Sequence, residues 1–226
     1  MKWAVGITAC PRPVDYLPAM LESLREAGWG EVTVFAEPGT PVPPGQPASM
    51  AQRRQGPWPS FLRALRSLVS IAPHAASLAV FQDDILVAQN CRAWLESQEP
   101  RPGISSLYIS EHQAKDRPPG WSALDPDAIP YGACAVVISL ETARLILANP
   151  PEPQAIRMTD TWLGKFCREA GLPFWQHVPS LVRHVGRESS LARKGDRPII
   201  RPWVPARHEG EFCEDAMLLG PAEIPV

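Results

Sequence analysis

The chain has 226 residues, of which 45% are hydrophobic and 20% are charged, and its formal net charge is −2 at pH 7. This composition is ordinary for a globular protein, and the length suits one sizeable α/β domain. A charge so close to neutral excludes a general attraction to nucleic acid or acidic membranes, so such a partner would need a local basic patch.

The cysteines and the apolar segments set further limits. The five cysteines are odd in number and none forms a C-x-x-C pair, which argues against a disulfide framework and a cysteine zinc site. The most apolar stretch, residues 68–81, is interrupted by Pro73 and His74, so no membrane span is expected. The N-terminal apolar run is too short for a signal sequence. We therefore expect a cytoplasmic protein.

The first predicted elements form a strand-helix-strand unit. Residues 3–8 are a compact apolar run typical of a buried strand. Asp15 is placed to cap a helix over residues 16–27, in which apolar residues recur at helical spacing. Residues 31–36, "EVTVFA", predict a second strand. A strand, a helix and a second strand within this length indicate a βαβ unit with parallel strands.

The alternation of strands and helices continues, with long loops between them. Residues 37–59 are rich in Pro, Gly and Gln and predict a loop, followed by a helix over 60–72 and a strand over 78–81. The later expected elements are a helix over 91–97, a strand over 104–110, a loop over 111–130, a strand over 132–139, and helices over 141–148 and 159–170. The last fifty residues are expected to be irregular. The pattern predicts an α/β sandwich with a mostly parallel central sheet.

Polar residues follow three of the predicted strands. Residues 8–12 follow the first strand, Glu37 follows the second, and Gln82-Asp83-Asp84 follow the third. In parallel sheets, ligands bind beyond the carboxyl ends of the strands. The sequence therefore predicts one site built from these three strand ends.

Two adjacent carboxylates at the end of a buried strand are costly unless they are compensated. Three explanations are open: a solvated turn, a divalent cation, or pairing with an arginine, for which the candidates are Arg12, Arg53, Arg54 and Arg63. The position of Asp83 and Asp84 after a buried strand favours the cation. A cation with one or two carboxylate ligands usually takes others from substrate phosphates, which indicates a nucleoside diphosphate or triphosphate. The chain contains neither a P-loop nor a G-x-G-x-x-G motif.

Four segments, in order, resemble a known family. They are "GITACPRPVDYLPAMLESLREAGWGEVTVFAEPG", "FLRALRSLV", "FQDDI" and "TDTWLGKFCREAGLPFWQHVPSLVRHVGRESSL". Together they look like a metal-dependent glycosyltransferase of the GT-A fold, up to about residue 190. "QDD" resembles the DxD-type motif that binds Mn²⁺ or Mg²⁺ and the donor diphosphate. It departs from Asp-x-Asp and is closer to a Glu-Asp-Asp variant, with Gln82 in place of the first acid.

The resemblance implies a domain organisation. A GT-A-like (Rossmann-like) α/β/α catalytic domain would span residues 1–190. Within it, residues 1–90 would form the nucleotide-sugar half and residues 91–190 the acceptor half. An irregular basic tail, residues 191–226, would pack on the same domain.

The resemblance also implies roles in the donor site. Asp84 would bind the metal directly, and Asp83 would contact the ribose or the donor sugar. The residues implied to line the nucleoside pocket are Thr8, Ala9, Arg12 and Glu37. Arg63, on the helix before the motif, could meet a phosphate or Asp83, or lie on a solvated helix face.

A second set of residues is implied for the metal and the chemistry. His184 is a candidate metal ligand, because many members of the family supply a late histidine; His177 is more typical of a structural residue. Asp160 would be the general base that takes the proton of the acceptor hydroxyl, giving an inverting displacement. It could equally serve as a helix cap. Glu111 is the rival base.

The acceptor is expected to meet Trp121 and Gly132. Trp121 lies in a Pro-rich loop, where it could stack on a sugar or base or simply fix the loop, and Gly132 could let a ligand approach the backbone. Residues 183–207 contain seven Lys and Arg residues. This segment could close over the donor diphosphate, form a solvated tail, or bind a nucleic-acid acceptor on whose bases Trp203 could stack.

The resulting functional prediction is a metal-assisted glycosyltransferase with a nucleotide-diphosphate donor, a UDP-sugar being favoured. The acceptor would be a glycan, a small molecule or a hydroxylated nucleic-acid base. One alternative is a sugar-phosphate nucleotidyltransferase, which shares the α/β core but usually has a Gly-rich loop after the first strand that "TACPRPVDY" lacks. Another is a non-catalytic module that binds a nucleotide sugar.

Overall fold

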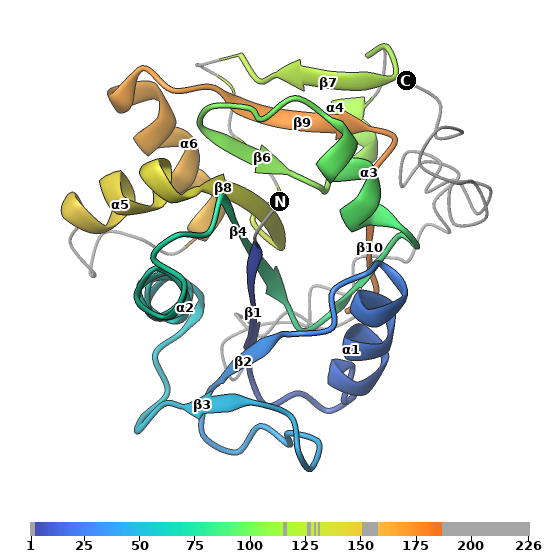
Figure 1. The fold of residues 1–226 in the computed structure, drawn as a ribbon, viewed down its shortest axis with the longest axis vertical. Helices are drawn as coiled ribbons and strands as arrows, with labels where there is room; N and C mark the ends of the chain where they lie inside the picture. Colours follow the sequence, from blue (N-terminus) through green and yellow to red (C-terminus); the bar gives the residue numbers. More distant parts are fainter. Residues whose placement is uncertain are drawn as a thin grey trace, which may run out of the picture.

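The computed structural model describes residues 3–114, 117–125, 128, 130, 132–150 and 158–186. An eight-stranded sheet forms its centre, with the strand order β3-β2-β1-β4-β8-β6-β9-β7 (Figure 1). The strands of this sheet are β1 (Trp3–Ala9), β2 (Thr33–Ala36), β3 (Ala48–Met50), β4 (Ser77–Gln82), β6 (Ile104–Ser106), β7 (Gly120–Ala123), β8 (Ala135–Ser139) and β9 (Phe174–Val178). Two further strands, β5 (Ile85–Val87) and β10 (Val182–His184), form a separate antiparallel pair.

The central sheet is mostly parallel, as predicted. β3, β2, β1 and β4 are parallel neighbours, and β6 and β9 are also parallel to each other. β8 is antiparallel to both β4 and β6, and β7 is antiparallel to β9. The N-terminal four-stranded part and the C-terminal part therefore meet at the antiparallel pair β4–β8, where Val80 is opposite Val136.

Helices cover both faces of the sheet (Figure 1). The helices are α1 (Leu17–Glu26), α2 (Pro57–Ile71), α3 (Cys91–Ser97), α4 (Glu111–Ala114), α5 (Leu140–Ala148) and α6 (Thr159–Ala170). The core residues of α1 and α3 pack on one face, and those of α2, α5 and α6 pack on the other. Strand β4 shows why two layers form. Leu78 and Val80 pack in the layer of α2, α5 and α6, whereas Ala79 and Phe81 pack in the layer of α1 and α3. The reason is that successive side chains in a strand point to opposite faces of the sheet.

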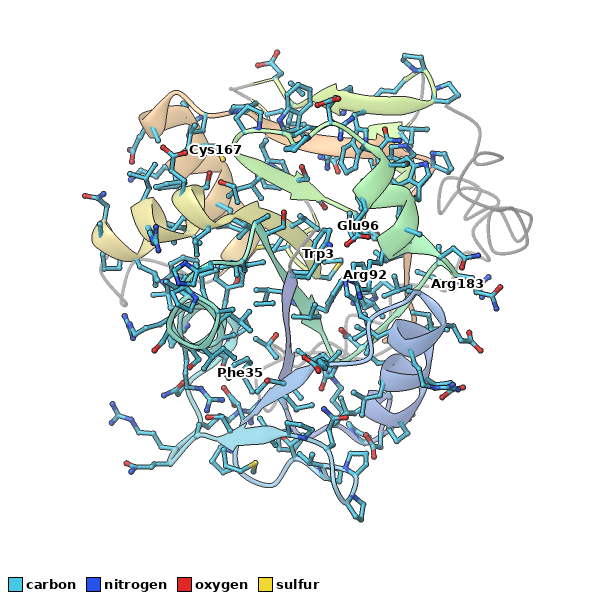
Figure 2. All side chains as sticks on the ribbon, in the orientation of Figure 1. Trp3, Phe35, Arg92, Glu96, Cys167 and Arg183 are labelled. Atoms are coloured by element: carbon cyan, nitrogen blue, oxygen red, sulfur yellow. The ribbon has the colours of Figure 1, made fainter. Side chains whose placement is uncertain are left out.

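The end of the sheet where β1 begins is closed by side-chain contacts. The indole Nε1 of Trp3 donates a 2.7 Å hydrogen bond to Glu96 of α3, and Arg92 pairs with the same carboxylate at 3.2 Å. Figure 2 shows the three side chains together beside the start of β1. The carboxyl ends of β1, β2 and β4 lie at the other end of the sheet.

Several predicted elements agree closely with the structure, and the short strands do not. The helices predicted over 91–97 and 159–170 are α3 and α6. Strand β3 lies inside the predicted loop 37–59, β7 lies inside the predicted loop 111–130, and β9 and β10 lie in or beside the segment expected to be irregular. These strands have three to five residues and are held by pairing with a neighbouring strand, which local sequence patterns do not encode. In the described part of the chain, no helix is long and apolar enough to cross a membrane.

Candidate functional site

The carboxyl ends of β1, β2 and β4 form one wall of a cavity of about 260 Å³. The register brings them level, because Thr8 of β1 is opposite both Phe35 of β2 and Gln82 of β4. The cavity is lined by residues 8–10 and Arg12 after β1, by Glu37, by the end of β4, and by the start of α2. The prediction that three strand ends converge at one edge of the sheet is therefore confirmed, and the binding of a ligand there stays a prediction.

Asp83 is held in place by an arginine. Its Oδ1 accepts hydrogen bonds from Nε and Nη2 of Arg12 at 3.0 and 2.8 Å, and its Oδ2 accepts one from the backbone amide of Cys10 at 3.0 Å. Asp83 and Asp84 are only 4% and 3% exposed, so the explanation as a solvated turn is wrong. Pairing with an arginine is confirmed for Arg12.

Asp84 has a different set of neighbours. Its Oδ2 lies 3.0 Å from Nη2 of Arg12 and 3.2 Å from Nε2 of His184. His184 arrives there because β10 pairs antiparallel with β5, with His184 opposite Ile85, the residue after Asp84. The backbone amides of Val185 and Gly186 then donate to the carbonyl oxygen of Asp84 at 2.9 and 3.2 Å. The pairing of β5 with β10 thus produces the predicted proximity of Asp84 and His184.

The pKa values of this cluster reflect burial and opposite charges. Burial alone would lower the pKa of Arg12, but the charge of Asp84 and the hydrogen bond to Asp83 raise it well above its usual value. Burial raises the pKa of Asp83, and the hydrogen bond from Arg12 opposes this effect. Burial acts on Asp84 in the same direction, but His184 and Arg12 outweigh it, so the pKa of Asp84 lies below its usual value. Asp84 is therefore ionised at neutral pH.

The residues around Asp84 fit a divalent cation that has other ligands as well. The Oδ1 atom of Asp84 is buried and has no hydrogen-bond partner in the part of the chain that the structure describes. Its Oδ2 and the His184 Nε2 are separated by 3.2 Å, close to the roughly 3 Å expected for two neighbouring ligands that each lie about 2.1 Å from one metal. Among the described residues, no group of three or more His, Cys, Asp or Glu side chains could hold a metal. A cation here would need further oxygen ligands, as Mg²⁺ takes from substrate phosphates and water.

Glu37 lines the cavity but also holds the start of α2. Its Oε1 accepts hydrogen bonds from the backbone amides of Gln55 and Gly56 at 3.0 and 2.6 Å and from the Ser60 hydroxyl at 2.9 Å. Its Oε2 lies 3.6 Å from Nε of Arg54. One carboxylate oxygen is therefore committed to the start of α2, and the other pairs with Arg54.

Arg63 lies on α2 with its guanidinium turned towards backbone carbonyl groups. It donates to the oxygens of Ser49 and Ala36 at 3.1 and 2.9 Å. These bonds join α2 to the ends of β2 and β3. The expected contact with Asp83 is not among its partners, since Arg12 takes that role, and a phosphate contact by Arg63 stays a prediction.

Asp160 lies in the first turn of α6, where its Oδ1 accepts from the backbone amide of Thr161 at 2.9 Å. The start of this helix is fixed by Trp162, whose ring centroid lies 4.3 Å from that of Trp58 in α2. Trp58 directly follows Pro57, which lines the cavity. The first turn of α6 thus packs on the first turn of α2, and the role of Asp160 as a base stays a prediction.

The Pro-rich segment around Trp121 predicted a loop, but this prediction is wrong for Trp121 itself. It belongs to β7, opposite His177 of β9, and is partly buried. It packs on Trp94 and His177 with ring centroids 6.0 and 5.0 Å apart, and the guanidinium of Arg101 lies 4.6 Å from its ring centroid. Trp121 therefore packs against the hydrophobic core, and an acceptor-binding role stays a prediction. His177 is buried and structural, as expected.

Close packing around the backbone explains why residue 132 is a glycine. A Cβ at this position would lie 2.4 Å from Oγ of Ser106 and 2.8 Å from the carbonyl oxygen of Tyr108, and φ is +124°. Protein therefore fills the space in which a ligand was expected to approach this backbone. An acceptor-binding role for Gly132 stays a prediction, but the glycine is no longer an argument for it.

Gly186 is a site residue that the sequence analysis missed. A Cβ there would lie 2.4 Å from Oδ2 of Asp84. The only signal in the sequence is a glycine two residues after the candidate ligand His184. The side chain of Glu111, the rival base, and residues 187–207 of the basic segment lie outside what the structure describes.

No protein-family model matches the chain, and no curated protein matches it. Among solved structures, it is similar to a CMP:2-keto-3-deoxy-manno-octonic acid synthetase complexed with CTP, at 14% identity over 78% of this chain and 89% of that one, with a TM-score of 0.49. It is also similar to a putative glucose-1-phosphate thymidylyltransferase from Bacillus anthracis in complex with a sucrose, at 10% identity over 77% and 89%, with a TM-score of 0.48. The second is by its name a nucleotidyltransferase, the alternative class considered from the sequence. Similarity at this level carries no argument about the reaction of this chain.

Proposed function

We propose that the chain is a glycosyltransferase that takes a sugar from a nucleoside-diphosphate donor, with a UDP-sugar favoured, and transfers it to an acceptor hydroxyl. The observation that carries this proposal is the buried pair Asp83–Asp84 beside the cavity at the strand ends. One carboxylate is fixed by Arg12, and the other has a histidine neighbour and an unpartnered oxygen.

The donor nucleotide would occupy the cavity, with its diphosphate next to Arg12 and the carboxylate pair. Thr8, Ala9 and Glu37 line this cavity and would contact the nucleoside. Asp83 is held rigidly by Arg12 and the Cys10 amide and would accept a hydrogen bond from the ribose or the sugar. Three hydrogen bonds fix its carboxylate before the substrate arrives, which lowers the ordering cost of binding.

Asp84 and His184 would hold a Mn²⁺ or Mg²⁺ ion, which supplies positive charge to the departing diphosphate. Asp84 has a depressed pKa and so keeps the ionised form that binds a cation. Asp160 would accept the proton of the acceptor hydroxyl as this attacks the anomeric carbon, so that one displacement inverts the configuration.

The second candidate is a sugar-phosphate nucleotidyltransferase. Such enzymes usually hold a nucleoside triphosphate under a Gly-rich loop after the first strand. Here that segment carries Pro11 and Pro13, and the side chain of Arg12 is 10% exposed and bound to both carboxylates. This arrangement favours glycosyl transfer, but the pocket itself would serve either reaction.

Thermal unfolding with a panel of nucleotides and nucleotide sugars, with and without Mn²⁺, tests the proposal. A ligand at one hundred times its Kd adds about 2.7 kcal/mol of stability, which for a chain of this size corresponds to a Tm rise on the order of 5–10 °C. We expect UDP or a UDP-sugar to give this rise only with Mn²⁺. Asp84→Asn should remove it, and the control Glu169→Gln, an exposed carboxylate on α6, should retain it.

Two activity measurements separate the candidates. Release of UDP from a UDP-sugar supports the glycosyltransferase. Release of pyrophosphate from UTP and a sugar 1-phosphate supports the nucleotidyltransferase. Binding without either product would indicate the non-catalytic module, and no shift with any nucleotide would refute the nucleotide site altogether.

A further inference from the structure

Arg12 occupies the position between the two carboxylates where a cation would act. Its Nη2 lies 2.8 Å from Oδ1 of Asp83 and 3.0 Å from Oδ2 of Asp84. The same Oδ2 atom of Asp84 is the one that faces His184 at 3.2 Å. A guanidinium and a metal bound by Asp84 and His184 would therefore share one carboxylate oxygen.

The guanidinium of Arg12 alone does not satisfy every oxygen of the two carboxylates. Two buried carboxylates share the guanidinium of Arg12, and Oδ1 of Asp84 has no hydrogen-bond partner among the described residues. Room for a cation therefore remains beside Asp84. A divalent ion on Asp84 would, however, lie next to Arg12, and two cations at such a distance repel each other in a poorly solvated site.

Arg12 can relieve this repulsion by turning towards the cavity. Its side chain lines the cavity, together with Asp83 and Thr8. A diphosphate in the cavity would offer the guanidinium new oxygen partners, for which its planar fork is well suited. Arg12 could then leave Asp84 while Nε keeps its 3.0 Å bond to Asp83.

We propose that Arg12 and the divalent cation compete for Asp84, and that the donor diphosphate ends this competition by taking the guanidinium, so that metal and nucleotide bind cooperatively. This inference rests on the proposed nucleotide-sugar site. Because coupling is reciprocal, metal binding must strengthen nucleotide binding by the same factor. Arg12 is thus a positioning residue that keeps the metal off Asp84 until the donor is present.

Binding of Mn²⁺, followed by electron paramagnetic resonance of the free ion, tests this proposal without any turnover. For the wild-type chain we expect UDP to tighten Mn²⁺ binding about tenfold or more, within the range usual for coupled sites. Uridine, which has no phosphate, should not tighten it. The Mn²⁺–UDP complex without protein is the reference.

Variants separate the competition from other causes of coupling. Arg12→Met should tighten Mn²⁺ binding in the absence of nucleotide and reduce the effect of UDP to less than about threefold. Arg25→Gln, at an exposed arginine paired with Glu22 on α1, should behave as wild type. If the loss of a buried charge prevents Arg12→Met from folding, Arg12→Lys serves instead, because a single ammonium contacts two carboxylates less well than a planar fork.

The outcomes distinguish this inference from the proposed function. If Mn²⁺ and UDP bind, but Mn²⁺ alone binds the variant no more tightly than the wild type, the competition is refuted and the nucleotide site stands. If UDP and Mn²⁺ bind independently in the wild type, the inference is again refuted. If neither ligand binds in any combination, the proposed function fails and the inference fails with it.

Discussion

The carboxylate of Glu37 accepts a 2.9 Å hydrogen bond from the hydroxyl of Ser60, which joins the end of β2 to the first turn of α2. The same oxygen also accepts from the backbone amides of Gln55 and Gly56. These two amides directly precede α2, and a carboxylate is a strong acceptor for backbone amides. The candidate nucleotide ligand Glu37 is therefore also a structural residue.

Substitution of Glu37 should separate these two roles. Glu37→Ala removes the acceptor of three donors, of which the Ser60 hydroxyl is buried, and should lower the free energy of unfolding by roughly 2–4 kcal/mol. Glu37→Gln keeps an acceptor oxygen and should cost less than about 1.5 kcal/mol. Urea unfolding measures both values, and Ser60→Ala provides the effect of one donor alone. Equal unfolding of Glu37→Ala and wild type would contradict the role of Glu37 as a cap.

Gly186 should be required for the geometry of Asp84. In Gly186→Ala the new Cβ would lie 2.4 Å from Oδ2 of Asp84, so the carboxylate must move. We expect the Tm rise with UDP and Mn²⁺ to be lost, with a stability cost on the order of 1–3 kcal/mol. Gly30→Ala is the matched control, because a Cβ there meets nothing within 4 Å. Retention of the full rise in Gly186→Ala would show that the position of Asp84 is not critical.

Asp160→Asn tests the proposed base. Loss of a general base typically slows a reaction by about 10²–10⁴-fold. The oxygen of the new side-chain amide can still accept the hydrogen bond that the Thr161 backbone now donates to Asp160. We therefore expect sugar transfer to collapse while the stabilisation by UDP and Mn²⁺ remains. If transfer proceeds at the wild-type rate, Asp160 is only a residue of the helix terminus.

The buried His177 should make the protein sensitive to acid. Burial lowers the pKa of His177 to about 4, a smaller contribution coming from the charge of Arg101. An unfolded histidine has a pKa of about 6.5, so between these values the unfolded state binds the proton and the folded state does not. Stability from this group is present above about pH 6.5 and is lost as the pH falls towards 4, by about 2 kcal/mol at pH 5.

Urea unfolding of wild type and His177→Asn at pH 7 and pH 5 measures this effect. The variant should be less stable at pH 7, because the imidazole fills a space between Trp94 and Trp121. Its further loss at pH 5 should be about 2 kcal/mol smaller than that of the wild type. Equal losses in both proteins would mean that other groups cause the acid sensitivity.

The sequence by itself determined the order of the main helices and strands and the edge of the sheet at which the candidate site lies. Apolar periodicity defines the longer elements, since a residue's polarity reflects which face of an element is buried. Asp83 and Asp84 could be recognised because they directly follow such a strand, β4. Glu37 and residues 8–12 could be added because parallel strands end at one edge.

Only the tertiary structure decided which of these residues act together. Arg12 pairs with Asp83 across 71 positions of sequence, and His184 reaches Asp84 through the three-residue pairing of β5 and β10. Trp121 was assigned to a loop because its strand has four residues and is formed by pairing with β9. Such contacts depend on strand pairing and packing between distant segments, which the local pattern of hydrophobic and polar residues does not specify.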